Sequence, residues 1–421
     1  MASLTRERVV RVPGDKSIAH RALMLAALAD GPSRLRGVPC SADVRATARV
    51  LSALGVDIPI DQADLIVEGR GLGGLRRPPV DLDCGNSGTT ARLMAGIVAG
   101  HAFRSRFVGD ASLSRRPMGR VALPLREMGA TVEVASGGGL PMIVRGAPLR
   151  PVSWTSPNAS AQVKSAVLLA ATVGGVRATV AEPAPSRDHT ERMLRSMGAK
   201  VVAEDNRVTV EPAPRLCPLD STIPGDPSSV AYFVAYAVLS RSTRVVCPDV
   251  CLNDRRTGFL RVLHATGAEV TWDVDRIVGG EEVGTITASA SRVSGMAIPE
   301  SEVSSTIDEL PLLACVAAHA EGETVISGAA ELRVKESDRL AALIENLRAL
   351  GAQVEPMADG LRIRGSERPL RGAVRTHGDH RLAMAFGVLG ALPGNEIAID
   401  DAGCVDVSYP AFWSDLERTA A

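Results

Sequence analysis

Residues able to bind anions or transfer protons cluster at the starts of six strongly apolar segments of this 421-residue chain. Lysine and arginine oppose the dipole at a helix N-terminus, whereas a bound phosphate or carboxylate is stabilised there. Serine, threonine and aspartate at the same places also have an ordinary reading as helix caps. Because capping does not explain the cations, we predict anion sites that converge in a cleft between two domains. The clusters are Lys16, Ser17 and Arg21; Asn86, Ser87, Gly88, Thr89, Thr90 and Arg92; Ser160, Gln162 and Lys164; Asp226, Ser228 and Ser229; Asp308 and Glu309; His377, Asp379, His380 and Arg381.

Two polar stretches indicate proton transfer. Residues 304–311 place two adjacent acids before an apolar helix, and residues 333–339 alternate charges at the predicted start of an outer helix. The second stretch also fits a solvated helix start with i,i+4 pairing. If these stretches are functional, lysine and arginine hold anions while Asp308 and Glu336 move protons.

Common cofactor motifs are absent from the sequence. Residues 14–17 lack the spacing of a P-loop, and no G-x-G-x-x-G follows a predicted strand. His377 and His380 lack a third metal ligand, and His189 has the default reading of a cap or surface residue at an outer helix start. The sequence therefore predicts neither a metal nor an organic cofactor.

Composition excludes several classes of protein. The 47 Lys+Arg balance 48 Asp+Glu, so the chain lacks the basic excess of a nucleic-acid binder. No apolar run approaches the ~20 residues of a membrane helix, and the N-terminus lacks an apolar signal-peptide region. The 7 cysteines are odd in number and form no C-x-x-C pair. We expect a cytoplasmic protein with reduced thiols, no nucleic-acid or membrane partner, and cores built from aliphatic side chains.

Two phrases repeat about every seventy residues. One is a leucine-rich helix end, a glycine suited to the left-handed C′ position and a strand start. Its glycines are Gly55, Gly129, Gly198, Gly267 and Gly351. The other is a polar start, an apolar helix and a strand. These second helices, apolar on most faces, should be buried, and the first family should form outer amphipathic helices. The buried helices begin near Ser17, Thr89, Ser160, Ser228, Ile307 and Asp379.

The six copies divide into two halves. The segment PGDKS at residues 13–17 recurs as PGDPS at residues 224–228, half the chain away. We predict an α/β fold with domain I formed by residues 1–15 and 225–421 and domain II by residues 16–224. The strand predicted at residues 8–12 is expected to complete the sixth copy, with the two PGD segments crossing between domains.

Nine ordered motifs resemble one family. They read PGDKSIAHRAL, GNSGTTARL, RRPMGR, SAQVKSA, SRDHTERM, GDPSS, TIDELP, RVKESDRL and DHRLAMAF. The chain resembles the 5-enolpyruvylshikimate-3-phosphate synthase (3-phosphoshikimate 1-carboxyvinyltransferase) family of enolpyruvyl transferases over essentially its whole length. The resemblance implies a two-domain inside-out α/β barrel (α+β), each domain made of three βαβαββ repeats with buried helices.

The resemblance also implies an activity in the shikimate pathway, which leads to chorismate and the aromatic amino acids. The enolpyruvyl group of phosphoenolpyruvate is transferred to the 5-hydroxyl of shikimate 3-phosphate, releasing phosphate by addition–elimination through a tetrahedral ketal, without a cofactor. The implied catalytic residues are Asp308, Glu336 and Lys16. Those implied for phosphoenolpyruvate are Lys16, Gly88, Arg116, Gln162, Arg339 and Arg381. Those implied for shikimate 3-phosphate are Lys16, Ser17, Arg21, Ser160, Gln162, Arg187, Asp308 and Lys335.

Some positions depart from the family or remain open. Only four of the basic residues are lysines, and Lys16, Lys164 and Lys335 are expected to line the same anionic-substrate cleft. Many relatives have lysine where this chain has Val407, so one phosphate contact is predicted to be missing. With glycine at position 88, we predict intermediate or ordinary sensitivity to glyphosate.

Three alternatives remain. A UDP-N-acetylglucosamine carboxyvinyltransferase usually carries a cysteine in the loop that here spans residues 109–117 and contains none. An enolpyruvyl transferase acting on another cyclic alcohol, and a non-catalytic binder of phosphorylated metabolites, are the others. The presence of both Asp308 and Glu336 disfavours the binder. The expected partners are the two small substrates, and a monomer is expected.

Overall fold

The computed structural model describes residues 6–62 and 64–421. It is an α/β structure that divides into two compact units. Unit 1 comprises residues 1–13, 224–276 and 282–421, and unit 2 comprises residues 14–223 and 277–281. The chain therefore passes between units next to the two PGD segments, and the turn Ile277–Glu281 groups with unit 2.

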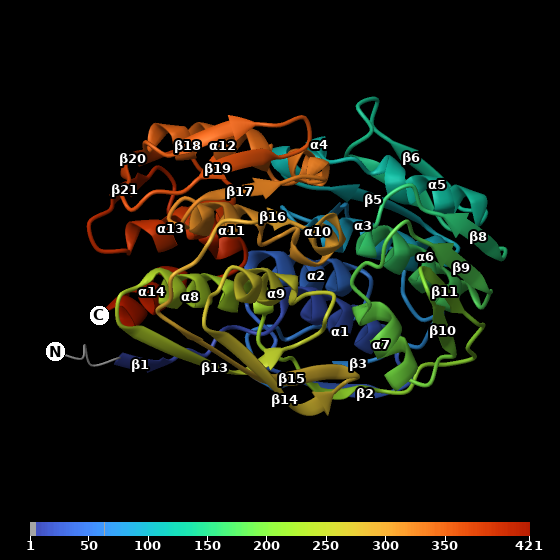
Figure 1. The fold of residues 1–421 in the computed structure, drawn as a ribbon. Helices are drawn as coiled ribbons and strands as arrows, with labels where there is room; N and C mark the ends of the chain where they lie inside the picture. The colour runs from blue at the N-terminus through green and yellow to red at the C-terminus, as the bar shows by residue number, and fades with distance from the viewer. Residues whose placement is uncertain (1–5, 63) are drawn as a thin grey trace. The chain divides into compact units, whose positions relative to one another are not determined.

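Unit 2 contains three copies of a strand–helix–strand–helix pattern, each closed by one or two antiparallel strands (Figure 1). The first copy is β12(Asp220–Thr222), α1(Lys16–Leu28), β2(Pro32–Arg36), α2(Ala42–Ala53) and β3(Asp64–Glu68). The second is β4(Leu82–Asp83), α3(Gly88–Ala99), β5(Arg104–Val108), α4(Ala111–Arg115), α5(Gly119–Glu127), β6(Thr131–Val134) and β7(Met142–Arg145). The third is β8(Val152–Thr155), α6(Ala161–Gly174), β9(Ala178–Ala181), α7(His189–Ser196), β10(Val201–Glu204) and β11(Arg207–Val210).

Unit 1 contains the other three copies. Its first is β1(Arg6–Val9), α8(Pro227–Leu239), β13(Thr243–Cys251), α9(Gly258–Ala265), β14(Val270–Val278) and β15(Glu281–Ser289). Its second is β16(Ala297–Ile298), α10(Glu300–Thr306), α11(Leu310–Ala317), β17(Glu323–Ile326), η1(Ala330–Val334), α12(Arg339–Ala349), β18(Gln353–Pro356) and β19(Leu361–Arg364). Its third is β20(Arg371–Val374), α13(His380–Gly390), β21(Glu396–Ile399), η2(Gly403–Val407) and α14(Phe412–Ala420).

Each copy has its own small sheet with the same pairing. The strand before and the strand after the buried helix are parallel, as in β4 with β5 and β8 with β9. In the four-stranded sheets the closing hairpin adds antiparallel strands. A parallel pair needs a crossover between its strands, and the buried helix supplies it. In the four copies that are continuous in sequence, the N-terminus of that helix therefore follows the end of the first strand, whereas β12 and β1 join the first and fourth copies from elsewhere along the chain.

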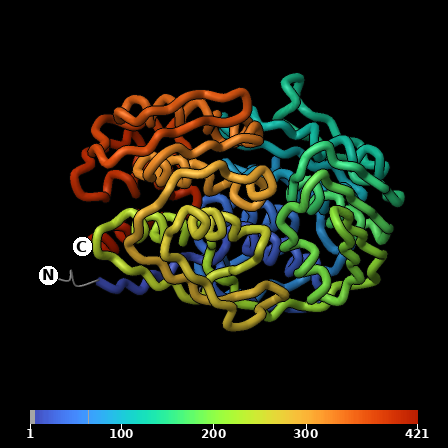
Figure 2. The backbone as a smooth tube through the Cα atoms, viewed as in Figure 1, coloured from blue at the N-terminus to red at the C-terminus, as the bar shows by residue number. Residues whose placement is uncertain are grey.

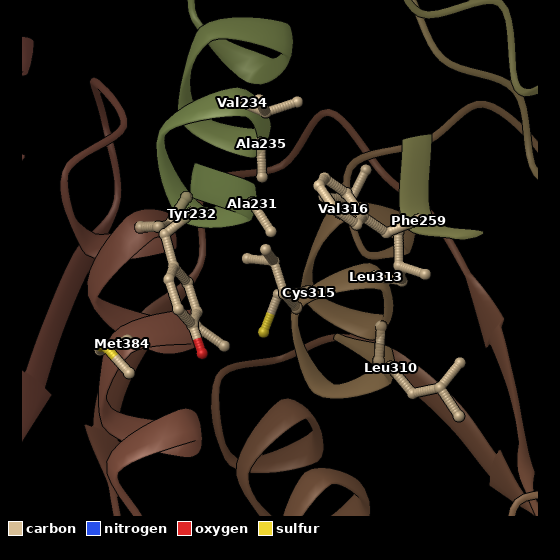
Figure 3. Close-up of a cluster of buried hydrophobic side chains, with 14 of the residues drawn as sticks. Ala231, Tyr232, Val234, Ala235, Phe259, Leu310, Leu313, Cys315, Val316 and Met384 are labelled. Carbon is tan, nitrogen blue, oxygen red and sulfur yellow. The ribbon is translucent and has the colours of Figure 1, made fainter. Parts of the chain in front are cut away.

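The six predicted buried helices are confirmed. In α8 every residue from Pro227 to Val238 is buried, and α1, α3, α6, α11 and α13 are buried along most of their lengths. Figure 3 shows how α8 and α11 of unit 1 meet, with Phe259 of α9 and Met384 of α13 beside them. Cys315 and Ala231 are among the side chains between these two helices. Residues this small allow close approach of the helices, as the aliphatic composition implies.

The predicted C′ glycines are also confirmed. Gly55, Gly129, Gly198, Gly267 and Gly351 all have positive φ, between 90° and 109°. Each ends an outer helix, where only glycine adopts this conformation without a steric cost. These turns direct the chain from the outer helix into the strand that follows.

The predicted place of the N-terminal strand was wrong in one respect. The strand spans Arg6–Val9, and it pairs in parallel with β13 of the fourth copy, not with the sixth. The blue and yellow-green segments of this pair can be followed in Figure 2. The sixth copy has only the parallel pair β20 and β21. Alternation of apolar residues predicts a strand but does not encode its partner, which depends on the tertiary fold.

Candidate active site

Three of the predicted anion-binding helix starts lie together within unit 2. Ser87 caps α3 and Ser160 caps α6, each through its hydroxyl oxygen, and Asp15 caps α1 through its carboxylate. The first turns of α3 and α6 are joined by a hydrogen bond from Gln162 Nε2 to Thr89 Oγ1 at 2.9 Å. The helices supply exposed N–H groups and the side chains supply cations, which is the combination that favours a bound anion.

Arginines surround Gly88 at the start of α3. Arg92 Nη1 donates to Gln162 Oε1 at 2.6 Å, and Arg116 Nη2 donates to Asn86 Oδ1 at 2.5 Å. A Cβ at Gly88 would lie 2.8 Å from Nη1 of Arg92 and 3.4 Å from Nη1 of Arg116. Glycine therefore lets two guanidinium groups approach the N-terminus of α3. Of the residues in this cluster, Gly88, Arg116 and Gln162 were predicted to bind phosphoenolpyruvate.

Lys16 begins α1 and forms an ion pair within unit 2. Its Nζ lies 2.9 Å from Oδ2 of Asp43, a residue of α2 that is largely buried. Asp43 was not recognised from the sequence, where it reads as an ordinary acid in the first turn of an outer helix. The pair restrains the ammonium group at the helix start. Ser17, the next residue, accepts a hydrogen bond from Arg21 through its carbonyl oxygen at 2.9 Å.

His20 is buried on the same helix, one turn after Lys16. Its Nδ1 lies 2.6 Å from Thr47 Oγ1, which in turn lies 2.6 Å from Thr90 Oγ1. Burial, together with the positive charges of Lys16 and Arg21, lowers the pKa of His20 well below its usual value. A neutral imidazole thus links α1, α2 and α3.

Arg21 and Lys164 are both buried and interact with other side chains of unit 2. Arg21 is buried, with Nε donating to Thr190 at 2.8 Å and Nη2 to Ser165 at 3.0 Å. Lys164 is 1% exposed and lies between Glu182 and Glu191. The expectation that Lys164 lines the anionic-substrate cleft was wrong, because two buried carboxylates already pair with its charge.

His189 is likewise buried instead of lying at the surface. Its Nδ1 lies 2.8 Å from Oε1 of Glu281, and both side chains are almost fully enclosed. Asp188, not His189, is the residue preceding α7. The polar sequence around His189 resembles an exposed helix start, and only the tertiary contact with Glu281 explains its burial.

In unit 1, Asp308 is surrounded by cations. Its Oδ1 lies 3.6 Å from Lys335 Nζ and 3.6 Å from Arg339 Nη1, and its Oδ2 lies 3.5 Å from Arg381 Nη2. Asp308 lies in the turn between α10 and α11, and the neighbouring Glu309 is the residue immediately before α11. Three positive groups around one carboxylate favour its ionised form, which can accept a proton.

Glu336 reaches the same group of cations. Its Oε2 lies 2.5 Å from Nη2 of Arg339, while Nε of that arginine pairs with Asp379 at 2.8 Å. Burial alone would lower the pKa of Arg339, but the carboxylates of Asp379 and Glu336 raise it above the usual value. Burial also acts to lower the pKa of Arg381, but the nearby carboxylate of Asp308, together with its neighbours, raises it above the usual value. Both arginines therefore remain cationic.

The loop that carries Lys335 and Glu336 was predicted as the start of an outer helix, which was wrong. Residues 330–334 form the 3₁₀ helix η1, and α12 begins only at Arg339, with Asp338 as its cap. Lys335 and Glu336 thus lie in the intervening turn. The alternating charges have helical spacing, but Asp338 accepts from Ala341 N–H and starts the helix later.

A second buried network supports the cations of unit 1. Arg256 is 1% exposed, and its Nη2 donates to Asp226 Oδ1 and Ser228 Oγ, each at 2.9 Å. Ser228 also donates to Glu309, which lies 3.5 Å from Arg381. Arg256 was not recognised from the sequence, because nothing in its local pattern distinguishes it from the neighbouring Arg255, which is only partly buried. The network connects the starts of α8 and α11 to α13.

Within residues 6–62 and 64–421, no three His, Cys, Asp or Glu side chains are grouped to hold a metal ion. His380 lies beside Arg381 at the start of α13, where an arginine would oppose a bound cation.

Within residues 6–62 and 64–421, no helix combines the length and apolar character needed to cross a bilayer.

The chain is similar to known proteins over almost its whole length. A family described as EPSP synthase (3-phosphoshikimate 1-carboxyvinyltransferase) matches residues 5–416. The chain belongs to the EPSP synthase family. A 3-phosphoshikimate 1-carboxyvinyltransferase from Alkalilimnicola ehrlichii is 47% identical over 96% of this chain and 91% of its own length. One from Thermus thermophilus is 47% identical over 98% of this chain and 96% of its own.

Solved structures agree with this membership. EPSP synthase from Acinetobacter baumannii superimposes with a TM-score of 0.87 at 38% identity, covering 99% of this chain and 96% of the other. The predicted family and the two-domain α/β fold are thereby confirmed. The enolpyruvyl transferase NikO from Streptomyces tendae has a TM-score of 0.79 at 19% identity, covering 100% of this chain and 96% of its own, and shares the fold.

Proposed function

We propose that this EPSP synthase family member transfers the carboxyvinyl group of phosphoenolpyruvate to the 5-hydroxyl of shikimate 3-phosphate, a step of the shikimate pathway. The observation that carries the proposal at the level of residues is the position of Asp308 among Lys335, Arg339 and Arg381. A carboxylate kept ionised by cations suits removal of a hydroxyl proton, and the same cations suit polyanionic substrates.

Substrate binding is assigned to both units. For phosphoenolpyruvate we propose Lys16, Gly88, Arg116, Gln162, Arg339 and Arg381. For shikimate 3-phosphate we propose Lys16, Ser17, Arg21, Ser160, Gln162, Arg187, Asp308 and Lys335. The guanidinium groups near Gly88 and the helix N-termini of α3 and α6 support the first set, since both present donors to phosphate oxygens.

The chemistry divides into an addition and an elimination. In the addition, Asp308 accepts the proton of the 5-hydroxyl as its oxygen bonds to C2 of phosphoenolpyruvate, and Glu336 delivers a proton to the methylene carbon C3. The product is a tetrahedral ketal with a methyl group. In the elimination both proton transfers reverse: Glu336 takes a proton from that methyl group, and Asp308 returns its proton to the phosphate as the C2–O bond to phosphate breaks and the C2=C3 double bond re-forms. Lys16 and the arginines stabilise the charge on the departing phosphate.

The test measures phosphate released from phosphoenolpyruvate and shikimate 3-phosphate. Release is expected only when both substrates are present, and Asp308→Ala and Glu336→Gln are each expected to lower kcat at least about a hundredfold. Glu345→Gln is the matched control, because Glu345 is a half-exposed carboxylate on α12 with a long ion pair to Arg375. Absence of release by the wild type, or undiminished release by Asp308→Ala, contradicts the proposal. Phosphate release with UDP-N-acetylglucosamine in place of shikimate 3-phosphate would favour the sister activity.

A further inference from the structure

A buried cluster of three charged side chains joins α6 to the segment before α7 in unit 2. Lys164 Nζ lies 2.8 Å from Glu182 Oε2 and 2.9 Å from Glu191 Oε1. The exposed fractions of these side chains are 1%, 3% and 1%. Charges this deeply buried must be paired, and the chemistry proposed above assigns no role to this cluster.

Glu182 accepts hydrogen bonds from two other segments in addition to its ion pair with Lys164. Its Oε1 accepts a hydrogen bond from the backbone N–H of Ser160 at 2.8 Å. Both of its oxygens accept from the hydroxyl of Ser186, each at 2.8 Å. Lys164 adds a bond to the carbonyl oxygen of Ser186 at 3.3 Å. One carboxylate therefore fixes the cap of α6 and the residue immediately before Arg187.

Glu191 makes no comparable connection. Both of its carboxylate oxygens are buried without a hydrogen-bond partner, and its ion pair is with Lys164. Glu191 and Glu182 thus have the same charge, similar burial and the same cation, but only Glu182 contacts the two segments. Comparing variants of these two residues therefore distinguishes the effect of the hydrogen bonds of Glu182 from the effect of removing a buried negative charge.

We infer that Glu182, held by Lys164, is a positioning residue that fixes Ser160 and Arg187 in the arrangement that binds shikimate 3-phosphate. The inference rests on the proposed function, which assigns these two residues to that substrate. Glu182 itself is buried behind them and touches no substrate in this scheme. Its loss should weaken binding of shikimate 3-phosphate more than binding of phosphoenolpyruvate, because Ser160 and Arg187 are proposed to contact shikimate 3-phosphate alone.

Removing either glutamate changes the charge of the cluster by the same amount. The wild-type cluster has one cation and two carboxylates, so Glu182→Ala and Glu191→Ala each leave one neutral ion pair with Lys164. Both variants delete the same atoms from the same buried region. Differences between them therefore report the bonds to Ser160 and Ser186 and not the change in charge.

The experiment compares steady-state kinetics of phosphate release and backbone hydrogen exchange in the two variants. Glu182→Ala is expected to raise KM for shikimate 3-phosphate at least about tenfold, with KM for phosphoenolpyruvate changed less than about threefold. Hydrogen exchange at residues 158–162 and 185–188 should become faster. Glu191→Ala should leave that KM within about twofold and the exchange unchanged, and Glu182→Gln, which keeps an acceptor oxygen, should be intermediate.

Equal effects of Glu182→Ala and Glu191→Ala on the KM for shikimate 3-phosphate would overturn the inference, as would an equal rise in KM for both substrates after Glu182→Ala. Unchanged exchange at both segments after Glu182→Ala overturns it independently of catalysis. If the wild type releases no phosphate, the proposed function fails. The exchange measurement then still decides whether Glu182 fixes the two segments.

Discussion

Replacing Gly88 with alanine should weaken binding of phosphoenolpyruvate without harming the fold. The added Cβ would lie 2.8 Å from Nη1 of Arg92. Ordinary contact begins at about 3.5 Å, so the guanidinium must retreat by about 0.7 Å. The same Nη1 donates to Gln162 at 2.6 Å. Losing a hydrogen bond to a charged group costs about 1.5–3 kcal/mol, and KM for phosphoenolpyruvate should rise about tenfold to a hundredfold.

The matched control is Gly119→Ala. Gly119 is also the first residue of a helix, but no atom outside its immediate chain neighbours lies within 4 Å of an added Cβ. Both variants should be folded; the free energy of unfolding of Gly119→Ala should stay within about 1 kcal/mol of the wild type, and that of Gly88→Ala should fall by no more than the ~1.5–3 kcal/mol of the lost hydrogen bond. The reasoning is refuted if Gly88→Ala leaves KM for phosphoenolpyruvate within twofold of both the wild type and the control. Inhibition by glyphosate, measured on the same proteins, tests the intermediate or ordinary sensitivity predicted for glycine at this position.

Three further changes test packing and buried charge. Gly96→Ala places a Cβ 2.2 Å from the carbonyl oxygen of Ala166, so α3 and α6 must separate; we expect a loss of about 3 kcal/mol in urea unfolding, and an unchanged midpoint would contradict this. His20 is neutral in the folded state because its pKa is lowered, so stability should fall as the pH drops below about 6.5, by up to about 1.4 kcal/mol per pH unit. The His20→Asn variant should take up about one proton fewer on unfolding between pH 7 and pH 5, so its free energy of unfolding should fall less steeply with pH. Equal slopes in the variant and the wild type would show that His20 is charged in the fold. Arg256→Met leaves Asp226 without its buried cation, so thermal unfolding should show a loss of about 3–5 kcal/mol that Asp226→Asn partly restores; a fully additive double variant would argue against the pairing.

The local elements were predictable because their signals are local. Apolar runs predicted the buried helices, and the glycine at position 55 and its counterparts predicted where outer helices end. The order of the motifs singled out Asp308 and Glu336, whose catalytic roles stay predictions. That both carboxylates lie beside Arg339 depends on the fold and could not be read from the motifs.

The roles of buried charges were not predictable from sequence. Lys164 sits in a motif beside Gln162 and reads as a substrate-binding cation, yet its partners are Glu182 and Glu191. Asp43 reads as a helix-start acid, yet it pairs with Lys16. In each case the partner comes from another element. Side-chain spacing along one helix cannot specify which residue of a neighbouring element lies opposite.

Two strands, β1 and β12, lie far along the chain from the strands with which they pair, and this separation constrains the order of folding during synthesis. Residues Arg6–Val9 are made first, but their partner β13 emerges from the ribosome only after all of residues 14–223. Conversely, β2 gains its parallel neighbour only when Asp220–Thr222 have been made. A nascent chain halted before that point exposes the open edge of β2, which invites pairing with other chains. Residues 14–223 of unit 2 can therefore fold before unit 1, whereas residues 277–281 of unit 2 are made later and Arg6–Val9 cannot pair until β13 has been synthesised.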